Sequence, residues 1–183
     1  MKRICYILSL LFLLAGCHRT APQSPSKRSG MKQKADTTVL SLMEINQRLA
    51  EQADIELVAL VDSLQKADGS EFAQLSTGGW KKRRDPQARE AAQYADFPKP
   101  SEHWLVRIRA YSLQGDLLKD VEGVYTIKHF DMPIAVEEAV DEMCEGETAT
   151  IYAPWYTAYG VQGDKTVKPY TNVRFEVTLK EKQ

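Results

Sequence analysis

The chain contains few of the side chains that ligate metals or form disulfides. Its 183 residues include only three cysteines and three histidines, and His18, His103 and His129 lack the spacing of a metal site. The formal net charge is −1, so the charge does not predict a nucleic-acid partner. The composition, 43% hydrophobic and 27% charged, is that of an ordinary globular protein. We therefore expect no metal and no nucleic acid.

Long apolar segments are also missing. The run Ile4–Leu14 follows two basic residues and is too short to span a bilayer as a mature helix. It ends in Leu13–Cys17, which resembles the cleavage site of bacterial lipoproteins, where the cut falls before the cysteine and the thiol receives the lipid. We predict a signal peptide at residues 1–16 and lipidation of Cys17. The alternative is an ordinary signal peptide with an incidental cysteine.

Cysteine use fits an exported protein. Cys5 would leave with the signal peptide and Cys17 would carry the lipid, so Cys144 alone would remain and no intramolecular disulfide could form. We expect Cys144 to be buried and inert rather than a reactive thiol. The predicted location is the bacterial cell envelope, with the protein lipid-anchored to a membrane and facing the periplasm, because no acidic run follows Cys17.

Two segments precede the main predicted domain. Residues 17–36 are rich in serine, proline, glutamine, lysine and glycine, which predicts a flexible tether. Residues 37–70 predict a helix over about Val39–Lys66, with a capping box at Ser41–Glu44 and a stop at Asp68–Gly69. Apolar residues recur along it at three- and four-residue steps: Leu42, Ile45, Leu49, Ala53, Leu57, Val61 and Leu64. This stripe packs either on its own domain or on a second chain, and the periodicity favours neither.

The next part of the chain changes to strand patterns. Trp80 follows two glycines and marks a short strand, and the basic run Lys81–Arg84 predicts a solvated turn. Apolar and polar residues alternate over Trp104–Ala110, which predicts a half-buried antiparallel strand. A hairpin turn is expected at Gln114–Asp116 and a further strand at Val124–Ile127.

A short helix is predicted at Ala135–Met143, and Gly146 provides its left-handed exit. Its inward positions are Val136, Ala139, Val140 and Met143, and its outward positions are Glu137, Glu138, Asp141 and Glu142. Strands at Thr148–Tyr152 and Val173–Leu179 follow. Only this helix interrupts the strands, so residues 71–183 predict an α+β fold, a curved antiparallel β-sheet wrapped over a short α-helix.

Several motifs in this order resemble the FKBP-type peptidyl-prolyl isomerases. Each motif is common alone, but the order and spacing together are specific. They are Glu137–Glu138, Met143, Gly146–Glu147, Ala158–Tyr159–Gly160 and Phe175–Leu179. The resemblance is good from Met132 onward and thinner over Trp104–Ile127. It implies an FKBP-like domain, and the helix before it resembles the N-terminal extension of lipid-anchored FKBP-like proteins of the gliding-motility-associated kind.

The resemblance also implies a proline-binding pocket. Tyr159 would be the hydroxyl donor at its mouth and Phe175 one of its walls, and these two are the expected catalytic residues. Val136 stands where the family has the tryptophan of the pocket floor. The other implied substrate-binding residues are Met132, Pro133, Tyr125, Ile108 and Leu118. Without the surrounding motifs, ordinary packing would account for Tyr159 and Phe175.

Besides Val136, and Ala135 in place of the family's glycine before that tryptophan, two further places depart from the family pattern. Aligned without a gap, Pro133 falls where the family donates a backbone N–H to the substrate, and proline has none. A shift of one residue would place Met132 there instead. The Phe-Asp pair after the first hairpin appears here as Leu118–Asp120, so the aromatic ring is lost and the aspartate is displaced.

Three functions follow as expectations. The first is a peptidyl-prolyl cis-trans isomerase that assists folding of exported proteins at the membrane, with proline-containing polypeptides as substrates. X-Pro isomerisation is slow enough to delay folding, and its catalysis needs no cofactor. The second is a catalytically weak or inactive FKBP-like binding module. The third is a structural lipoprotein that forms a homo-oligomer through the helix at residues 37–70.

Overall fold

A computed structural model describes residues 29–83 and 97–183. The predicted signal peptide at 1–16, Cys17, the first part of the tether and Arg84 lie outside the described residues. The chain divides into two compact units, Met1–Leu42 and Met43–Gln183. The described part of the first unit is helical, and the second unit contains the sheet and every residue of the predicted site.

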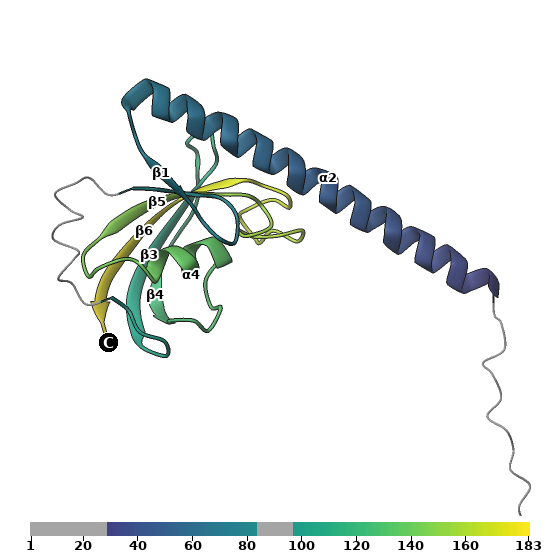
Figure 1. The fold of residues 1–183 in the computed structure, drawn as a ribbon. Coiled ribbons are helices and arrows are strands. Elements are labelled where there is room, and N and C mark those ends of the chain that lie inside the picture. Colours follow the sequence, from purple (N-terminus) through teal and green to yellow (C-terminus); the bar gives the residue numbers. More distant parts are fainter. Residues whose placement is uncertain (1–28, 84–96) are drawn as a thin grey trace, which may run out of the picture. The chain divides into compact units, whose positions relative to one another are not determined.

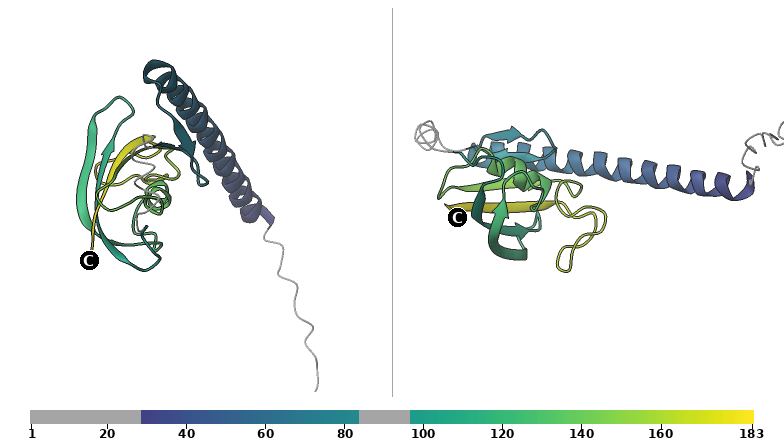
Figure 2. Two further views of the ribbon diagram at one scale, coloured as in Figure 1. Left: turned by 60° about the vertical axis from the view of Figure 1, so that its left-hand side comes forward. Right: turned by 90° about the horizontal axis from the view of Figure 1, so that it is seen from below.

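The second unit is built on a six-stranded sheet in the order β1-β2-β5-β6-β3-β4, in which all neighbours pair antiparallel. Its strands are β1 (Phe72–Gln74), β2 (Trp80–Lys82), β3 (His103–Tyr111), β4 (Leu117–Thr126), β5 (Thr148–Ala153) and β6 (Val173–Lys182). The sheet curves around the short helix α4 (Ile134–Val140), which packs on β5 and β6 (Figures 1 and 2). The predicted α+β fold is confirmed.

The core lies between α4 and the concave face of the sheet. Burial alternates along β3 and β6, as the apolar pattern predicts, because successive side chains in a strand point to opposite faces. All four side chains predicted to face inward from the helix, Val136, Ala139, Val140 and Met143, are fully buried. The prediction that Glu137 faces outward is wrong. It is buried because the segment before the helix folds back beside it.

Several boundaries differ from the predictions. The long helix α2 (Ser29–Asp68) begins ahead of Val39, so it includes part of the predicted tether, and the proposed capping box at Ser41–Glu44 lies within the helix. Its end is as predicted, because Gly69 takes a left-handed conformation and donates its N–H to Gln65. β4 starts earlier than predicted, since the hairpin pairs with β3 along its whole length.

Lys81 is buried in β2, although the basic run predicts a solvated turn. Its Nζ donates to the Ala139 carbonyl oxygen at 3.1 Å and lies 3.3 Å from a carboxylate oxygen of Glu142. The Ala139 carbonyl oxygen, which also accepts the Glu142 N–H at 3.3 Å, thus gains a second donor at the C-terminal end of α4, where positive charge is favourable. The prediction failed because a count of charges along the chain does not show which lysine reaches a helix end.

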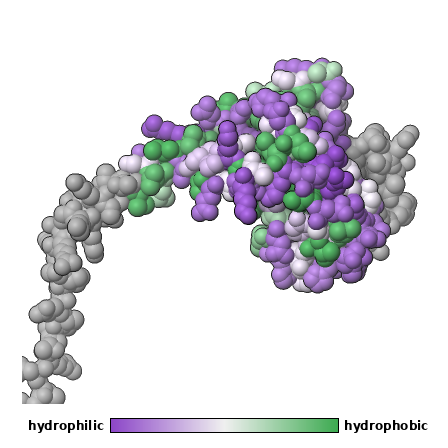
Figure 3. Space-filling view, turned by 180° about the vertical axis from the view of Figure 1, so that it is seen from behind, coloured by the Kyte–Doolittle hydropathy of each residue, from purple (hydrophilic) through white to green (hydrophobic). Residues whose placement is uncertain are grey.

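The apolar stripe of α2 has two different environments. Ala53, Leu57 and Val61 are buried within the second unit, whereas Leu42 and Ile45 are exposed. Part of the stripe therefore packs on its own domain, and the exposed part leaves the predicted contact with a second chain as a prediction. Figure 3 shows apolar side chains on the helix surface among hydrophilic ones.

Among the described residues, no helix combines the length and apolarity that a membrane crossing requires. Cys144, expected to be buried, is partly buried.

Candidate functional site

The loop that carries Tyr159 is folded by its own hydrogen bonds. The N–H groups of Thr157 and Ala158 donate to the Pro154 carbonyl oxygen at 3.1 and 3.2 Å, and the Gly160 N–H donates to the Trp155 carbonyl oxygen at 2.7 Å. Gly160 has a φ of 69°, a conformation that glycine adopts without strain. The loop therefore presents Tyr159 from a fixed turn.

The same loop is fastened to the start of α4. The Ala135 N–H donates to the Thr157 carbonyl oxygen at 3.2 Å. This bond satisfies one of the N–H groups that the first turn of a helix leaves unpaired. It also sets the distance between the Tyr159 loop and Val136, the next residue of α4.

Tyr159 contacts Phe175, as the resemblance implies. Their ring centroids lie 5.8 Å apart with the ring planes inclined by 47°. Phe175 is the third residue of β6, opposite Ile151 of β5 and Ala110 of β3, and is fully buried. The central strand thus supplies a rigid aromatic surface beneath Tyr159.

Seven of the predicted site residues belong to the hydrophobic core of the second unit or pack against it. Ile108, Met132, Val136 and Phe175 belong to the buried core, and Leu118, Tyr125 and Tyr159 are partly buried and pack against it. We call these seven residues the Tyr159 cluster. They come from β3, β4, α4, β6 and two loops, so the cluster exists only in the folded domain.

The environment keeps the Tyr159 hydroxyl protonated. Burial, together with the nearby Asp164 carboxylate and Tyr125, raises the pKa of Tyr159 well above its ordinary value. No side chain among the described residues forms a hydrogen bond with this hydroxyl. Tyr159 is therefore a neutral donor throughout the physiological pH range and is available to a carbonyl oxygen of a bound ligand.

Lys119 and Asp164 are members of the site whose roles the sequence did not reveal. The Lys119 ammonium lies 5.1 Å from the centroid of the Tyr159 ring, a cation–π distance, and pairs with the Asp164 carboxylate. Burial acts to raise the pKa of Asp164, but hydrogen bonds from Lys119 and from the N–H groups of Thr166 and Val167 hold it well below the ordinary range. The ion pair therefore stays charged beside Tyr159.

A signal for this pair was present in the sequence. Lys119 stands in the segment where the family has Phe-Asp, so this chain has a positive charge there that the family pattern lacks. Its partner Asp164 lies 45 residues further along the chain in a loop without a regular pattern. Only the structure joins the two.

Pro133 precedes α4 and takes the N-cap position. Its carbonyl oxygen accepts the N–H groups of Val136 and Glu137, both at 2.9 Å, and it has no N–H of its own. The Met132 N–H is the adjacent backbone donor, and no described residue accepts a hydrogen bond from it. Pro133 itself is half-buried at the edge of the cluster.

The far side of the 154–172 loop is held by α2. The hydroxyl of Tyr156 donates to Asp54 at 2.6 Å, and the amide of Asn172 donates to Glu56 at 2.6 Å. The Trp155 indole N–H also reaches a carbonyl oxygen of α2 at 3.3 Å. Burial and the bond to Asp54 raise the pKa of Tyr156 well above its ordinary value, so this donor also stays protonated.

The described residues contain no group of three or more histidine, cysteine or acidic side chains placed to hold a metal ion. What the Tyr159 cluster offers is a buried apolar core with the partly buried Leu118, Tyr125 and Tyr159 packed against it, one neutral hydroxyl donor and one ion pair. Such surroundings suit an uncharged ligand with a carbonyl group.

Comparisons with known proteins agree with this geometry. Residues 119–180 match the model of the FKBP-type peptidyl-prolyl cis-trans isomerase family. A peptidyl-prolyl cis-trans isomerase from Pseudomonas syringae is similar in structure, with 18% identity and a TM-score of 0.52 over 73% of this chain and 96% of that chain. FkpA from Escherichia coli shows 15% identity and a TM-score of 0.53 over 100% of this chain and 83% of that chain. No curated protein matches the sequence. The chain therefore contains an FKBP-like domain, and its residues 119–180 have the sequence pattern of the FKBP-type isomerase family.

Proposed function

We propose that this protein is a peptidyl-prolyl cis-trans isomerase and that Tyr159 and Phe175 form its catalytic centre. The observation that carries the proposal is the pairing of a protonated, partly buried tyrosine hydroxyl with a fully buried aromatic wall. The family match covers both residues.

The chemistry needs no nucleophile. Rotation about the peptide C–N bond is opposed by roughly 18–20 kcal/mol, because resonance is lost as the bond twists. The planar amide is the more polar form and is better solvated by water, so an apolar surface around Phe175 and Val136 favours the twisted form. The Tyr159 hydroxyl donates to a carbonyl of the bound chain and fixes its orientation.

The rate of cis-to-trans conversion of a proline peptide tests this proposal. Tyr159→Phe removes only the hydroxyl, and we expect kcat/KM to fall roughly five- to tenfold, since one hydrogen bond contributes about 1 kcal/mol. Tyr170→Phe is the matched control, because its hydroxyl donates to Asn46 of α2 and not into the Tyr159 cluster. If the wild-type chain is folded but has no measurable activity, the proposal that it is an isomerase is wrong.

A second function is favoured by a specific observation. Pro133 occupies the N-cap of α4 and offers no N–H, and Val136 is smaller than the family's tryptophan. A binding module with the same cluster and little turnover would bind proline peptides without accelerating their isomerisation. Binding of a proline peptide by a chain that is inactive in the rate assay would support this function.

We further propose that the protein acts on exported polypeptides while anchored to a membrane through a lipid on Cys17, facing the periplasm. The support is the sequence Leu13–Cys17 after a short apolar run. Incorporation of labelled palmitate into the expressed protein, and its loss in Cys17→Ser, tests the anchor. If the wild-type protein incorporates no labelled palmitate, a lipid anchor on Cys17 is excluded.

The exposed part of the α2 stripe supports a homo-oligomer. Leu42 and Ile45 are both more than half exposed and stand one turn apart on the helix. We propose that they contact the same residues of a second copy. Molar mass in solution, compared between the wild type and a Leu42→Glu, Ile45→Glu variant, tests this contact, and a monomeric wild type would exclude it.

A further inference from the structure

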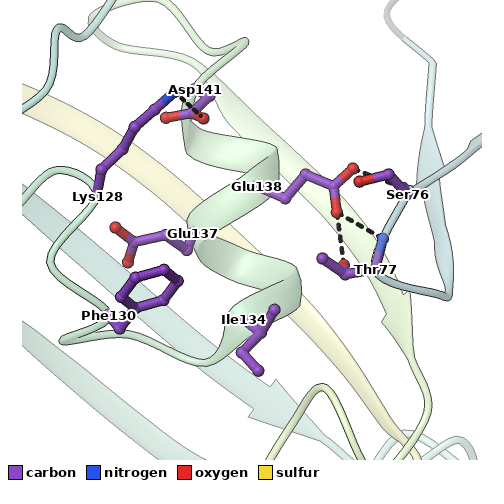
Figure 4. Close-up of a pocket in the computed structure, with 8 residues that line it drawn as sticks. All are labelled: Ser76, Thr77, Lys128, Phe130, Ile134, Glu137, Glu138 and Asp141. Carbon is purple, nitrogen blue, oxygen red and sulfur yellow. Dashed lines mark hydrogen bonds and ion pairs between the residues drawn. The ribbon is translucent and has the colours of Figure 1, made fainter.

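A cavity of about 210 Å³ lies on the outer side of α4, next to the segment that leads into the helix (Figure 4). It is lined by Ser76, Thr77, Lys128, Phe130, Ile134, Glu137, Glu138 and Asp141. None of these residues belongs to the Tyr159 cluster. The lining contains three acidic side chains and one basic side chain, so its formal charge is negative.

Glu137 is the unusual member of this cavity. Its side chain is 6% exposed, and neither carboxylate oxygen has a hydrogen-bond partner. An unpaired buried carboxylate is costly, because it loses its hydration and gains nothing in return. A cation bound in the cavity would offset this cost.

The other acidic groups of the cavity are already engaged. Glu138 accepts hydrogen bonds from the backbone N–H groups of Ser76 and Thr77 at 2.6 and 3.0 Å. Asp141 pairs through one oxygen with Lys128 Nζ at 3.1 Å, while its other oxygen is buried and unpartnered. Three acceptor oxygens therefore remain, two of them on Glu137.

Phe130 provides a planar group at the same place. It is 76% exposed, and Figure 4 shows its ring beside the Glu137 carboxylate. Phe130 and Lys128 have φ values of 58° and 63°, a conformation that residues with a Cβ rarely adopt. An exposed ring on this segment has little packing to lose when it turns away from the carboxylate.

We propose that this cavity binds the guanidinium group of an arginine side chain on a polypeptide. The two free oxygens of Glu137 match the paired N–H donors of a guanidinium, and the Phe130 ring offers a face on which that planar cation stacks. The ring turns outward to admit the ligand. The proposal does not depend on isomerase activity.

The test is a titration of the full chain with Nα-acetyl-L-arginine amide, followed through the backbone amide resonances of residues 128–141. Nα-acetyl-L-citrulline amide is the matched ligand, because it has nearly the same shape but no charge. We expect saturable shifts with the arginine compound alone. Equal shifts with the citrulline compound, or none with either, would overturn the proposal.

Two variants assign the binding to named groups. Glu137→Gln should weaken arginine binding roughly tenfold or more, because a charge-assisted bidentate contact is lost, while Glu145→Gln on the exposed turn after α4 should leave it unchanged. Phe130→Leu should weaken it roughly two- to fivefold.

Thermal unfolding without ligand separates a binding role for Glu137 from a structural one. Glu137→Gln should keep or raise the unfolding midpoint, since it removes an unpaired buried charge. A lowered midpoint would show that Glu137 is satisfied within the fold, and this would overturn the proposal.

Discussion

Replacement of Leu57 by alanine tests how α2 is held in the protein. Leu57 is 1% exposed although it stands on a helix whose other faces meet solvent, so its burial comes from the same unit of the same chain. Truncation of a buried leucine to alanine costs about 2–5 kcal/mol, the sum of lost transfer free energy and the cavity left behind. For a chain of this size a loss of about 3 kcal/mol lowers the unfolding midpoint by roughly 6–12 °C.

Ile55→Ala is the matched control, because Ile55 lies on the same helix but is 70% exposed. We expect it to change the free energy of unfolding by no more than about 0.5 kcal/mol, since surface substitutions seldom do more. Urea unfolding followed by tryptophan fluorescence is a suitable assay, because Trp155 bonds to α2. Equal effects of Leu57→Ala and Ile55→Ala would refute the docking of α2 on its own domain. A midpoint that rises with protein concentration would instead show that a second chain covers Leu57.

Two further predictions concern stability. Burial acts to raise the pKa of Glu138, but its hydrogen bonds from residues 76 and 77 lower it overall, so these bonds stabilise the fold above about pH 4.5 and their contribution is lost as the pH falls. Glu138→Gln should therefore lower the free energy of unfolding by about 1 kcal/mol at neutral pH, allowing for partial solvent screening. Urea unfolding at pH 7 and pH 3 should show that the difference between wild type and variant is smaller at pH 3. A difference that does not change with pH would contradict this role of the Glu138 hydrogen bonds. Gly79→Ala should destabilise the fold more than Gly115→Ala, because both have positive φ but a Cβ at Gly79 would lie 2.5 Å from the Tyr152 carbonyl oxygen, whereas Gly115 has open space around it. We expect about 1–3 kcal/mol for Gly115→Ala, and equal midpoints for the two variants would be contrary to this reasoning.

The regular elements could be predicted because their residues alternate or recur at a clear period. β3, α4 and β6 each follow such a pattern, and their buried faces are those that the pattern indicates, except that Glu137 of α4 is also buried. β1 was not predicted, since three residues are too few to show a period. The start of α2 was also poorly predicted, because this helix continues into a polar segment whose composition suggested a tether.

The residues of the candidate site could be named in advance only where a family motif surrounds them. Tyr159 and Phe175 lie within such motifs, and the structure places their rings in contact. The pairing of Lys119 with Asp164 and the burial of Glu137 depend on how separate segments meet in space. A linear pattern assigns a carboxylate on an amphipathic helix to solvent, and nothing in the sequence showed that residues 128–134 would cover this one.

The position of β6 in the sheet has a consequence for how the chain is made. β6 is the last strand along the chain, yet it lies between β5 and β3, so it joins the β1-β2-β5 half of the sheet to the β3-β4 hairpin. Until Val173–Lys182 has emerged from the ribosome, the two halves have no strand in common and the concave face cannot close over α4. The two halves of the sheet therefore cannot be joined until residues 173–182 have been synthesised.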